Sequence, residues 1–467
     1  MSVQIRDPVH NFIELREKEQ RLLSTPALQR LRRIRQLALA SLVYPGALHT
    51  RFDHTLGVMH VAGQMAESLE LDPDSVATVR LAAILHDIGH GPFSHVSEYA
   101  LERYADRRSL LREQKKEKIH EIVTGIMIAN DPELDLNNAD RDKFGRLLAT
   151  GYGERILRQI VSGPLDADKQ DYLLRDSYFC GVQYGVYDLR QLHRSLVSVA
   201  DNNNDHMLMI KADGVHAVEQ YVLAKYYLTT NVYRHKVRLI TDQMIVRAII
   251  LGIERDSLDE LRRLYSFDNT PEFAQQYAQW DDERFFHAFG RSDSGGKCRE
   301  ILCRLDQRRL LKRVFACKPS DLRSEASVHF LEPVRPDPDP DEQQRHDVSR
   351  KRIETGIADA IRSVTNQIAD ADFVIYHAFD IKSVKEMSRN DEASILVNKR
   401  PQPSPFEEES TLFYSIQEGF NDQFIEVYAP VTWTSRAERN TLHDKLRDKI
   451  MSVIEKELAT AGGGAAP

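Results

Sequence analysis

Residues 86–95, with the sequence HDIGHGPFSH, restrict the possible functions of this chain more than any other segment. His86 and His90 are four residues apart and therefore share one helical face, and Asp87 adds a hard oxygen ligand beside them. Glycines and a proline then break the helix, so that His95 can turn back toward the same pocket. Because so many imidazole and carboxylate groups among apolar neighbours are costly to bury without a metal or an anion, the segment predicts a metal site.

Two further segments offer metal ligands, although each can be understood more simply when taken alone. His54 follows Arg51 at the start of a predicted helix and lies on its apolar face, where a lone histidine is usually a hydrogen-bonded core residue. Asp168, Tyr172 and Asp176 share one face of another predicted helix, which a solvated helix with intrahelical ion pairs would explain equally well.

Together, His54, His86, Asp87 and Asp168 can supply imidazoles and carboxylates to a single divalent cation. Such an ion keeps further positions for water and a phosphate oxygen, acidifies water and neutralises phosphoryl charge. Because the ligand set is mixed, it accommodates Mg, Mn, Fe, Zn or Ni. The residues therefore predict metal-dependent hydrolysis of a phosphate ester.

The hydrophobic pattern predicts a mainly α fold, with a large helical domain and a smaller C-terminal α+β region. Apolar residues recur at three- and four-residue spacing from about residue 20 to 320, so we assign residues 1–330 to the helical domain. Residues 331–349 contain a run in which prolines alternate with aspartates, at 336–341, and this pattern predicts a linker or exposed loop. Residues 350–467 form the α+β region with a disordered tail, with strands expected at 372–381, 394–398, 411–416 and 424–428 and a last helix at 435–458.

Composition restricts partners and location. The chain has 467 residues and a formal net charge of -8, so binding of a polyanion would need a local basic patch. Nucleic acid is therefore a possible partner that the composition does not indicate. The basic cluster of Arg308, Arg309, Lys312 and Arg313 is such a patch, but a solvated helix face or a contact with a nucleotide explains it more simply. Four irregularly spaced cysteines predict reduced thiols, and the absence of a signal pattern or long apolar run predicts a cytoplasmic protein without membrane association.

Several short motifs occur in an order that resembles the HD-domain phosphohydrolases. Within that family, the chain is similar to the deoxynucleoside triphosphate triphosphohydrolases, in particular to the catalytic core of the SAM-and-HD-domain enzymes. The motifs are residues 7–10, 25–26, 29–32, 44–47, 51–54, 86–95, 168–176 and 233–237. Several motifs in one order are more specific than the His-Asp pair alone.

The resemblance implies the same metal ligands, His54, His86, Asp87 and Asp168, and adds roles for other residues. His90, His95 and His120 would face the phosphates, one of them as general acid, with Glu98 supporting a histidine. The residues implied in substrate binding are Arg51, Lys169 and Lys225 at the triphosphate, Gln36 and Asp176 at the 3′ hydroxyl, and Tyr172 and Tyr233 against the ribose. The tyrosines would leave no space for a 2′ hydroxyl, and the products would be deoxynucleoside and inorganic triphosphate.

The resemblance also implies regulation by a nucleotide bound between subunits of a homo-oligomer, either a tetramer or a dimer. Asp7, Gln29 and Arg32 match family residues at that allosteric site. Ser24 stands where relatives have an acidic residue that reads guanine, so we expect an altered base preference.

Two other functions remain open at this point. The same metal site would serve a phosphodiesterase or phosphatase that acts on other nucleotides or on nucleic-acid ends. Alternatively, the scaffold could bind nucleotides as a sensor without catalysis. Product identification separates the hydrolases, and loss of turnover on mutation of His86 or Asp87 separates an enzyme from a sensor.

Overall fold

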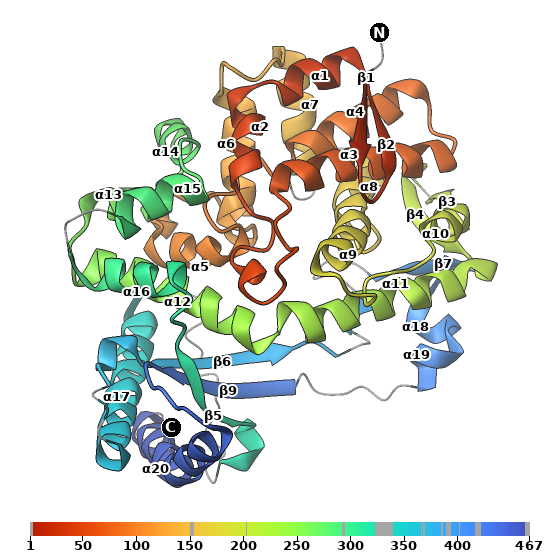
Figure 1. Ribbon diagram of the computed structural model, residues 1–467. Coiled ribbons are helices and arrows are strands. Elements are labelled where there is room, and N and C mark those ends of the chain that lie inside the picture. Colours follow the sequence, from red (N-terminus) through yellow and green to blue (C-terminus); the bar gives the residue numbers. More distant parts are fainter. Residues whose placement is uncertain are drawn as a thin grey trace.

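Helices build most of the fold, as the spacing of apolar residues predicts (Figure 1). The computed structural model describes residues 3–149, 154–201, 203–291, 295–322, 340–365, 367, 369–383, 386–388, 394–400, 402–415 and 422–462. The prediction of a mainly α chain with a smaller C-terminal α+β region is confirmed. Among the described residues, no helix is both long and apolar enough to cross a bilayer.

The N-terminal body is a group of helices around one large apolar core, with a hairpin at its edge. The hairpin consists of β1 (Val3–Asp7) and β2 (Asn11–Leu15), which pair antiparallel. The helices are α1 (Glu17–Leu23), α2 (Pro26–Arg30), α3 (Arg51–Ser68), α4 (Pro73–Leu85), α5 (His95–Tyr104), α6 (Ile119–Asn130), α7 (Asn138–Leu148), α8 (Arg155–Val161), α9 (Ala167–Cys180), α10 (Leu189–Ser195), α11 (Val215–Leu228), α12 (Lys236–Glu254), α13 (Asp259–Tyr265), α14 (Pro271–Tyr277), α15 (Asp282–Phe285) and α16 (Lys297–Asp306). Helices α11 and α12 follow one another across the middle of the molecule (Figure 1).

A second small sheet joins distant parts of the chain. β3 (Leu196–Ala200) pairs antiparallel with β4 (His206–Lys211), and β4 pairs in parallel with β7 (Leu396–Asn398), which in turn pairs with β8 (Ser404–Pro405). The strand expected at 394–398 is therefore confirmed at 396–398. Residues from the C-terminal third thus complete a sheet of the N-terminal body.

The strand expected at 411–416 is wrong. Residues Thr411–Ser415 form the short helix α19, which follows α18 (Phe406–Glu409), and residue 416 lies outside the described residues. The hydroxyl of Ser410 accepts a hydrogen bond from the backbone N–H of Phe413 at 3.0 Å, and the Phe413 ring is buried against Phe406 with centroids 5.0 Å apart. This cap and the aromatic contact outweigh the β propensity of the residues.

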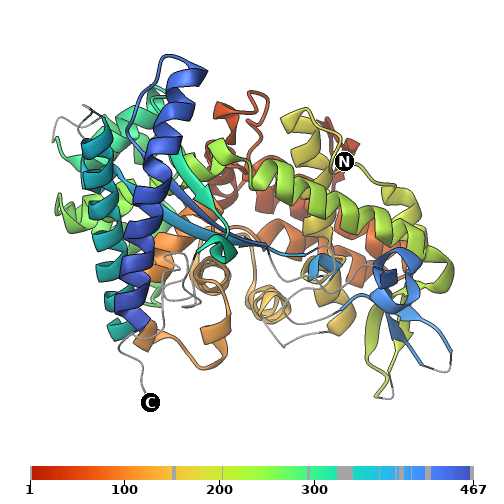
Figure 2. The same ribbon diagram turned by 90° about the horizontal axis from the view of Figure 1, so that it is seen from below.

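The C-terminal layer is a three-stranded antiparallel sheet that packs on two long helices. The strands β5 (Lys312–Cys317), β9 (Asp422–Ala429) and β6 (Ile375–Ile381) lie in that order, and helices α17 (Pro340–Val364) and α20 (Arg436–Gly462) lie side by side (Figure 2). The strands expected at 372–381 and 424–428 and the last helix are confirmed. The hydroxyl of Ser435 caps α20 by accepting from Glu438 N at 3.1 Å.

One boundary prediction needs correction. The linker expected at 331–349 is wrong from residue 340 onward, because α17 begins there, and a proline is well tolerated in the first turn of a helix. Residues 331–339 and the tail from 463 lie outside the described residues. Since β5 pairs with β9, we propose that the C-terminal layer begins near residue 312 and not at 350.

A close approach between α3 and α9 positions the site. A Cβ atom on Gly57 of α3 would lie 1.9 Å from Oδ1 of Asp171 and 2.4 Å from Nη2 of Arg175, both on α9. Only a residue without a side chain fits at this contact, which brings His54 of α3 beside the acidic face of α9.

We predict that Gly57→Ala destabilises the protein by about 3 kcal/mol, because the added methyl group must push apart buried charged side chains. Gly145→Ala in α7 is the control, since a Cβ there meets no atom within 4 Å. That change should raise the free energy of unfolding by about 0.5 kcal/mol through helix propensity. Urea unfolding of both variants tests this, and equal effects would contradict the close contact.

Candidate metal centre and active site

His54 is fixed at the start of α3 by a capping box. The carboxylate of Asp53 accepts from the backbone N–H of Thr50 at 2.8 Å, and the Thr50 hydroxyl accepts from Asp53 N at 3.3 Å. His54 Nδ1 lies 2.8 Å from Oδ2 of Asp171, and Nε2 lies 2.9 Å from Oδ1 of Asp168. One ring nitrogen therefore anchors the imidazole, and the other points into the site.

His86 and Asp87 follow directly after α4. The Nδ1 atom of His86 bonds to the carbonyl of Ala83 at 2.7 Å, whereas its buried Nε2 has no hydrogen-bond partner. This Nε2 lies 3.4 Å from Oδ1 of Asp87 and 3.9 Å from Oδ1 of Asp168. His54 Nε2 lies 3.9 Å from the other oxygen of Asp87, so His54, His86 and Asp87 bring ligand atoms within 4.8 Å of one another. Asp168 lies beside the two histidines of this group.

The donor chemistry of this group fits a divalent cation. In both histidines Nδ1 is engaged by an acceptor, which directs Nε2 toward the metal position. The Nε2 of His86 has no partner, whereas the Nε2 of His54 would exchange its contact with Asp168 Oδ1 for the metal. Two imidazole nitrogens with carboxylate oxygens form a borderline set suited to first-row divalent ions and magnesium. The orphaned, buried Nε2 of His86 is the atom that most needs such a partner.

A second group of histidines lies directly beside this one. His90, His95 and His120 place ring nitrogens within 4.8 Å of one another, and the His90 and His120 rings stack with centroids 3.9 Å apart. His90 Nε2 lies 3.4 Å from Oδ1 of Asp87, which joins the two groups. Burial and the nearby Arg51 guanidinium hold the pKa of His90 well below its usual range, which favours a neutral ring.

Glu98 supports His120, as the resemblance implies. One oxygen of Glu98 lies 2.8 Å from His120 Nδ1, and the other accepts from the backbone N–H of Ile119 at 2.7 Å. Burial acts against ionisation, yet His120 and this backbone N–H hold the pKa of Glu98 below its usual value. The carboxylate thereby orients His120.

A cluster of polar side chains lies at the far end of α9. Asp176 Oδ2 accepts from the Tyr233 hydroxyl at 2.6 Å, and Oδ1 lies 2.7 Å from Nε2 of His49. The Tyr172 and Tyr233 ring centroids are 6.2 Å apart, and Oε1 of buried Gln36 has no hydrogen-bond partner. The structure thus brings Tyr172, Asp176 and Tyr233 together, and Gln36 carries an acceptor that is free for a ligand.

The three cations expected at the triphosphate differ in their surroundings. Arg51 is buried, donates from Nε to Ser94 Oγ at 2.8 Å, pairs with Asp87, and keeps Nη2 without a partner. Lys169 Nζ instead lies 2.6 Å from Oδ2 of Asp166, and Lys225 Nζ donates to the carbonyl of Met387 at 3.0 Å. Arg51 therefore lies at the metal group, whereas each of the two lysines contacts another acceptor in the chain, Asp166 or the Met387 carbonyl.

Of the residues expected at an allosteric site, Asp7 has an internal role. Its Oδ2 accepts from Arg175 at 2.8 Å, and its Oδ1 accepts from the backbone N–H groups of Val9 and His10. Gln29 and Arg32 form a pair nearer the surface, with Arg32 Nε donating to Gln29 Oε1 at 2.9 Å. The nucleotide-binding role of these residues stays a prediction.

Sequence reasoning missed three residues that hold the site together. Asp171 lies 2.8 Å from His54 Nδ1, 2.6 Å from His10 Nε2 and 2.8 Å from Arg175 Nε. Burial opposes its charge, but Arg175 and the two histidines hold the pKa of Asp171 well below its usual range. Its position three residues after Asp168, on the same helical face, was the available signal.

Thr124 and His49 were the other two. The Thr124 hydroxyl accepts from Gly89 N and donates to the His120 carbonyl, both at 3.0 Å, so it ties the metal segment to the second histidine group. No spacing in the sequence distinguishes this threonine. His49 directly precedes the cap of α3, and its closeness to that motif was the only signal.

The comparison with known proteins agrees with this geometry. The profile of the HD domain matches residues 51–156, and the profile of the HD associated region matches residues 193–335. The first match contains His54, His86 and Asp87, the convergent group described above. The chain therefore contains an HD domain followed by an HD associated region.

Relatives with curated sequences match part of the chain. An uncharacterized protein of Methanocaldococcus jannaschii is 36% identical over 255 residues, which cover 55% of this chain and 51% of that protein. The uncharacterized protein YwfO of Bacillus subtilis is 31% identical over 52% of this chain and 54% of its own length. Human deoxynucleoside triphosphate triphosphohydrolase SAMHD1 is 26% identical over 68% of this chain and 55% of its own. The chain thus spans about half the length of these relatives.

Solved structures share the fold over nearly the whole chain. A phosphohydrolase from Bacteroides thetaiotaomicron superposes with a TM-score of 0.69 at 22% identity, covering 92% of this chain and 100% of that one. A hypothetical protein from Aquifex aeolicus gives 0.66 at 23% identity, covering 96% and 100%. At these identities the likeness shows a common fold.

We predict that Asp171→Ala lowers the free energy of unfolding by about 3 kcal/mol, because it removes one of the two carboxylates that neutralise buried Arg175. Asp142→Asn is the control, since Asp142 forms an exposed pair with Arg146 that contributes less than about 1 kcal/mol. Chemical denaturation of both variants measures the difference. Equal stability of the two variants would show that Asp171 is not the centre of a buried charge network.

Proposed function

We propose that this protein is a metal-dependent phosphohydrolase that converts deoxynucleoside triphosphates into deoxynucleoside and inorganic triphosphate. The observation that supports this most directly is the arrangement of α9. Asp168 faces the metal group, while Asp176, eight residues later and about 12 Å along the helix, lies in the polar cluster with Tyr233. One helix therefore offers a phosphate end and a sugar end at a separation suited to a nucleotide.

In this proposal His54, His86, Asp87 and Asp168 hold the metal. The bound ion supplies charge neutralisation at a phosphoryl group and acidifies water, and Mg, Mn, Fe, Zn or Ni suits the ligand set. Arg51, with Nη2 buried and unpartnered, lies against Asp87 and can bind a phosphate oxygen. Lys169 and Lys225 would join this clamp by leaving their present acceptors.

Proton transfer falls to the second histidine group. Glu98 engages Nδ1 of His120, so that the other ring nitrogen is the atom that can hold a proton or give it to the leaving 5′ oxygen. His90 is favoured as a neutral ring beside Asp87, where it can accept a hydrogen bond. His95 projects from the first residue of α5 and completes the group around the phosphates.

The sugar end explains selectivity for deoxynucleotides. Asp176, held by His49 and Tyr233, can accept from a 3′ hydroxyl, and the free Oε1 of Gln36 offers a second acceptor. Tyr172 lies between Asp168 and Asp176 along α9, 6.2 Å from the Tyr233 ring between centroids, where its ring would pack against the ribose. A ring against C2′ leaves no space for a 2′ hydroxyl.

Regulation forms part of the same proposal. We infer that the chain forms a homo-oligomer, a tetramer or a dimer, with a regulatory nucleotide between subunits. The resemblance to the dNTP triphosphohydrolases supports it, and so does the pair of Gln29 and Arg32 near the surface.

The first test is product identification. With Mn²⁺ or Mg²⁺ and each dNTP, the protein should release tripolyphosphate, detectable by ³¹P NMR, and not pyrophosphate or phosphate. His86→Ala and Asp87→Asn should lower kcat by about 100-fold or more, because each removes a metal ligand. His216→Ala is the control, since this histidine is exposed and pairs only with Glu219 among the contacts described. Pyrophosphate or phosphate as product, or full activity of the His86 variant, would contradict the proposal.

The second test concerns the sugar. We expect Tyr172→Ala to raise kcat/KM for ribonucleoside triphosphates relative to dNTPs by about tenfold, about 1.4 kcal/mol of discrimination, because it opens space beside C2′. Tyr178→Ala is the matched control, since Tyr178 lies on the same helix with 59% of its surface exposed. Steady-state kinetics with dGTP and GTP measure the ratio. An unchanged ratio in the Tyr172 variant would remove this account of selectivity.

A further inference from the structure

The segment that connects α4 to α5 has an unusual backbone where it carries catalytic groups. Phe93 and Ser94 have φ angles of 63° and 56°, in the left-handed region that side chains other than glycine rarely adopt. Such a conformation persists only where surrounding contacts hold it. His95, in the second histidine group, follows directly.

Asp282, the first residue of α15, supplies such a contact. Its Oδ1 accepts from the backbone N–H of Phe93 at 2.7 Å, and its Oδ2 accepts from the backbone N–H of Arg35 at 2.9 Å. The side chain is buried, and burial raises the pKa of Asp282 to about 7, although both backbone N–H groups act in the opposite direction. A carboxylate is costly to bury unless it is hydrogen-bonded, and the two backbone N–H groups offset part of this cost.

The two bonded segments belong to opposite ends of the site. Phe93 precedes His95 by two residues, whereas Arg35 directly precedes Gln36, whose backbone N–H donates to the His49 carbonyl at 3.1 Å. Ser94 joins the same two segments, because its hydroxyl donates to the Arg35 carbonyl at 2.6 Å and accepts from Arg51. One carboxylate therefore connects the backbone of the phosphate end to that of the sugar end.

Neighbouring residues hold Asp282 in place. Arg30 is buried and donates to the carbonyls of both Trp280 and Ile88, at 3.0 and 2.6 Å. A Cβ on Gly91 would lie 2.0 Å from the Tyr277 hydroxyl, so this ring packs directly against the loop. Residues 277–282 thus contact the loop directly at Gly91 and at Phe93, and Arg30 connects them to the loop at Ile88 as well.

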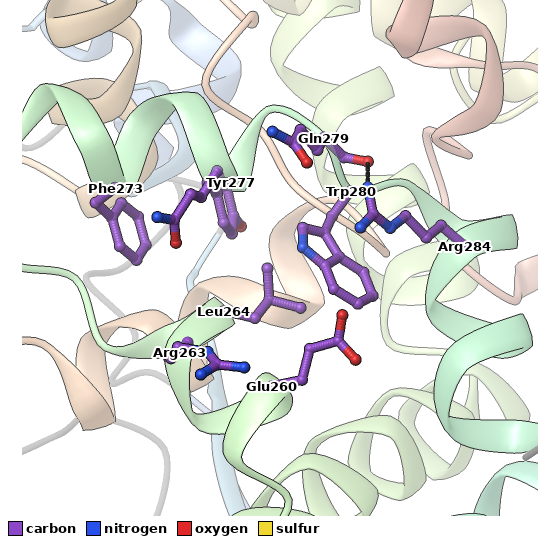
Figure 3. Close-up of a pocket in the computed structure, with 9 residues that line it drawn as sticks. Glu260, Arg263, Leu264, Phe273, Tyr277, Gln279, Trp280 and Arg284 are labelled. Atoms are coloured by element: carbon purple, nitrogen blue, oxygen red, sulfur yellow. Dashed lines mark hydrogen bonds between the residues drawn. The ribbon is translucent and has the colours of Figure 1, made fainter.

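Further contacts stabilise the turn between α14 and α15 beside a small cavity. Tyr277, Trp280 and Arg284 line a cavity of about 210 Å³ together with Glu260 and Arg263 (Figure 3). Arg284 Nη1 donates to the Gln279 carbonyl at 3.0 Å, and its guanidinium lies 4.5 Å from the centroid of the Trp280 ring. These contacts fix the turn that presents Asp282.

We infer that Asp282 is a positioning residue of the active site, which holds the loop before His95 and the segment before Gln36 in one fixed arrangement. The inference rests on the proposed function for its effect on turnover. Asp282 lies in the HD associated region, outside the matched HD domain, which gives that region a direct part in shaping the site.

Amide hydrogen exchange tests the positioning role independently of any substrate. In Asp282→Ala, exchange at Phe93 and at Arg35 should accelerate together by at least about tenfold, because both amides lose the same acceptor. Asp282→Asn should have a smaller effect, since its amide oxygen can still accept one bond. Asp281→Asn is the matched control: Asp281 is equally buried, but it accepts from Arg33 and from Arg284 N.

Turnover of the same metal-loaded proteins completes the test. We expect kcat with the best dNTP to fall about 10- to 100-fold in Asp282→Ala and less in Asp282→Asn, with bound metal unchanged and Asp281→Asn near wild type. Unchanged exchange at Phe93 and Arg35, or the same pattern in Asp281→Asn, would overturn the inference. Absence of wild-type turnover would instead count against the proposed function, while exchange still decides the role of Asp282. If the alanine variant fails to fold, the asparagine variant provides the comparison.

Discussion

The contact between α3 and α9 at Gly57 is the constraint on which the rest of the site depends. It brings His54 within hydrogen-bonding distance of both Asp168 and Asp171, one on the metal side and one on the core side. Asp171 also binds Arg175, which in turn binds Asp7 of the N-terminal hairpin. Buried charges of this kind stabilise a fold only when each has its partners. The position of the metal ligand His54 and the packing of the N-terminal hairpin therefore depend on the same buried charge network.

The site is also shared between distant parts of the chain. The HD domain supplies the convergent imidazoles and Asp87, whereas α9 contributes Asp168 and Asp176 and the HD associated region contributes Tyr233 and Asp282. Within the HD domain, the Thr124 hydroxyl connects Gly89 to His120, and the Ser94 hydroxyl connects Arg51 to the segment before Gln36. In the proposed function, the metal-binding motif alone would not define the substrate, because the residues of the sugar end come from other parts of the chain.

Much of the fold and of the candidate metal site could be predicted from the sequence, for physical reasons that differ from one element to the next. The metal group was accessible because imidazole and carboxylate groups are rarely buried together among apolar residues unless they bind an ion. The positions of β6, β9 and α20 could be predicted from the periodic spacing of apolar residues and from β propensity. The hairpin β1–β2 and strands β3 and β4 were not, since short strands that pair locally leave little pattern. The helix at 411–415 depends on one serine cap, and the helix from residue 340 overrides a proline-rich stretch. Asp171 and Asp282 look like any other helix acids until tertiary contacts give them partners.

Anomalous X-ray diffraction from crystals of protein purified without chelator tests the central claim most directly. At the absorption edge of the bound metal, one strong peak should lie among Nε2 of His54, Nε2 of His86 and the carboxylates of Asp87 and Asp168. A peak among His90, His95 and His120 instead, or separation of the four side chains in the measured structure, would contradict the account.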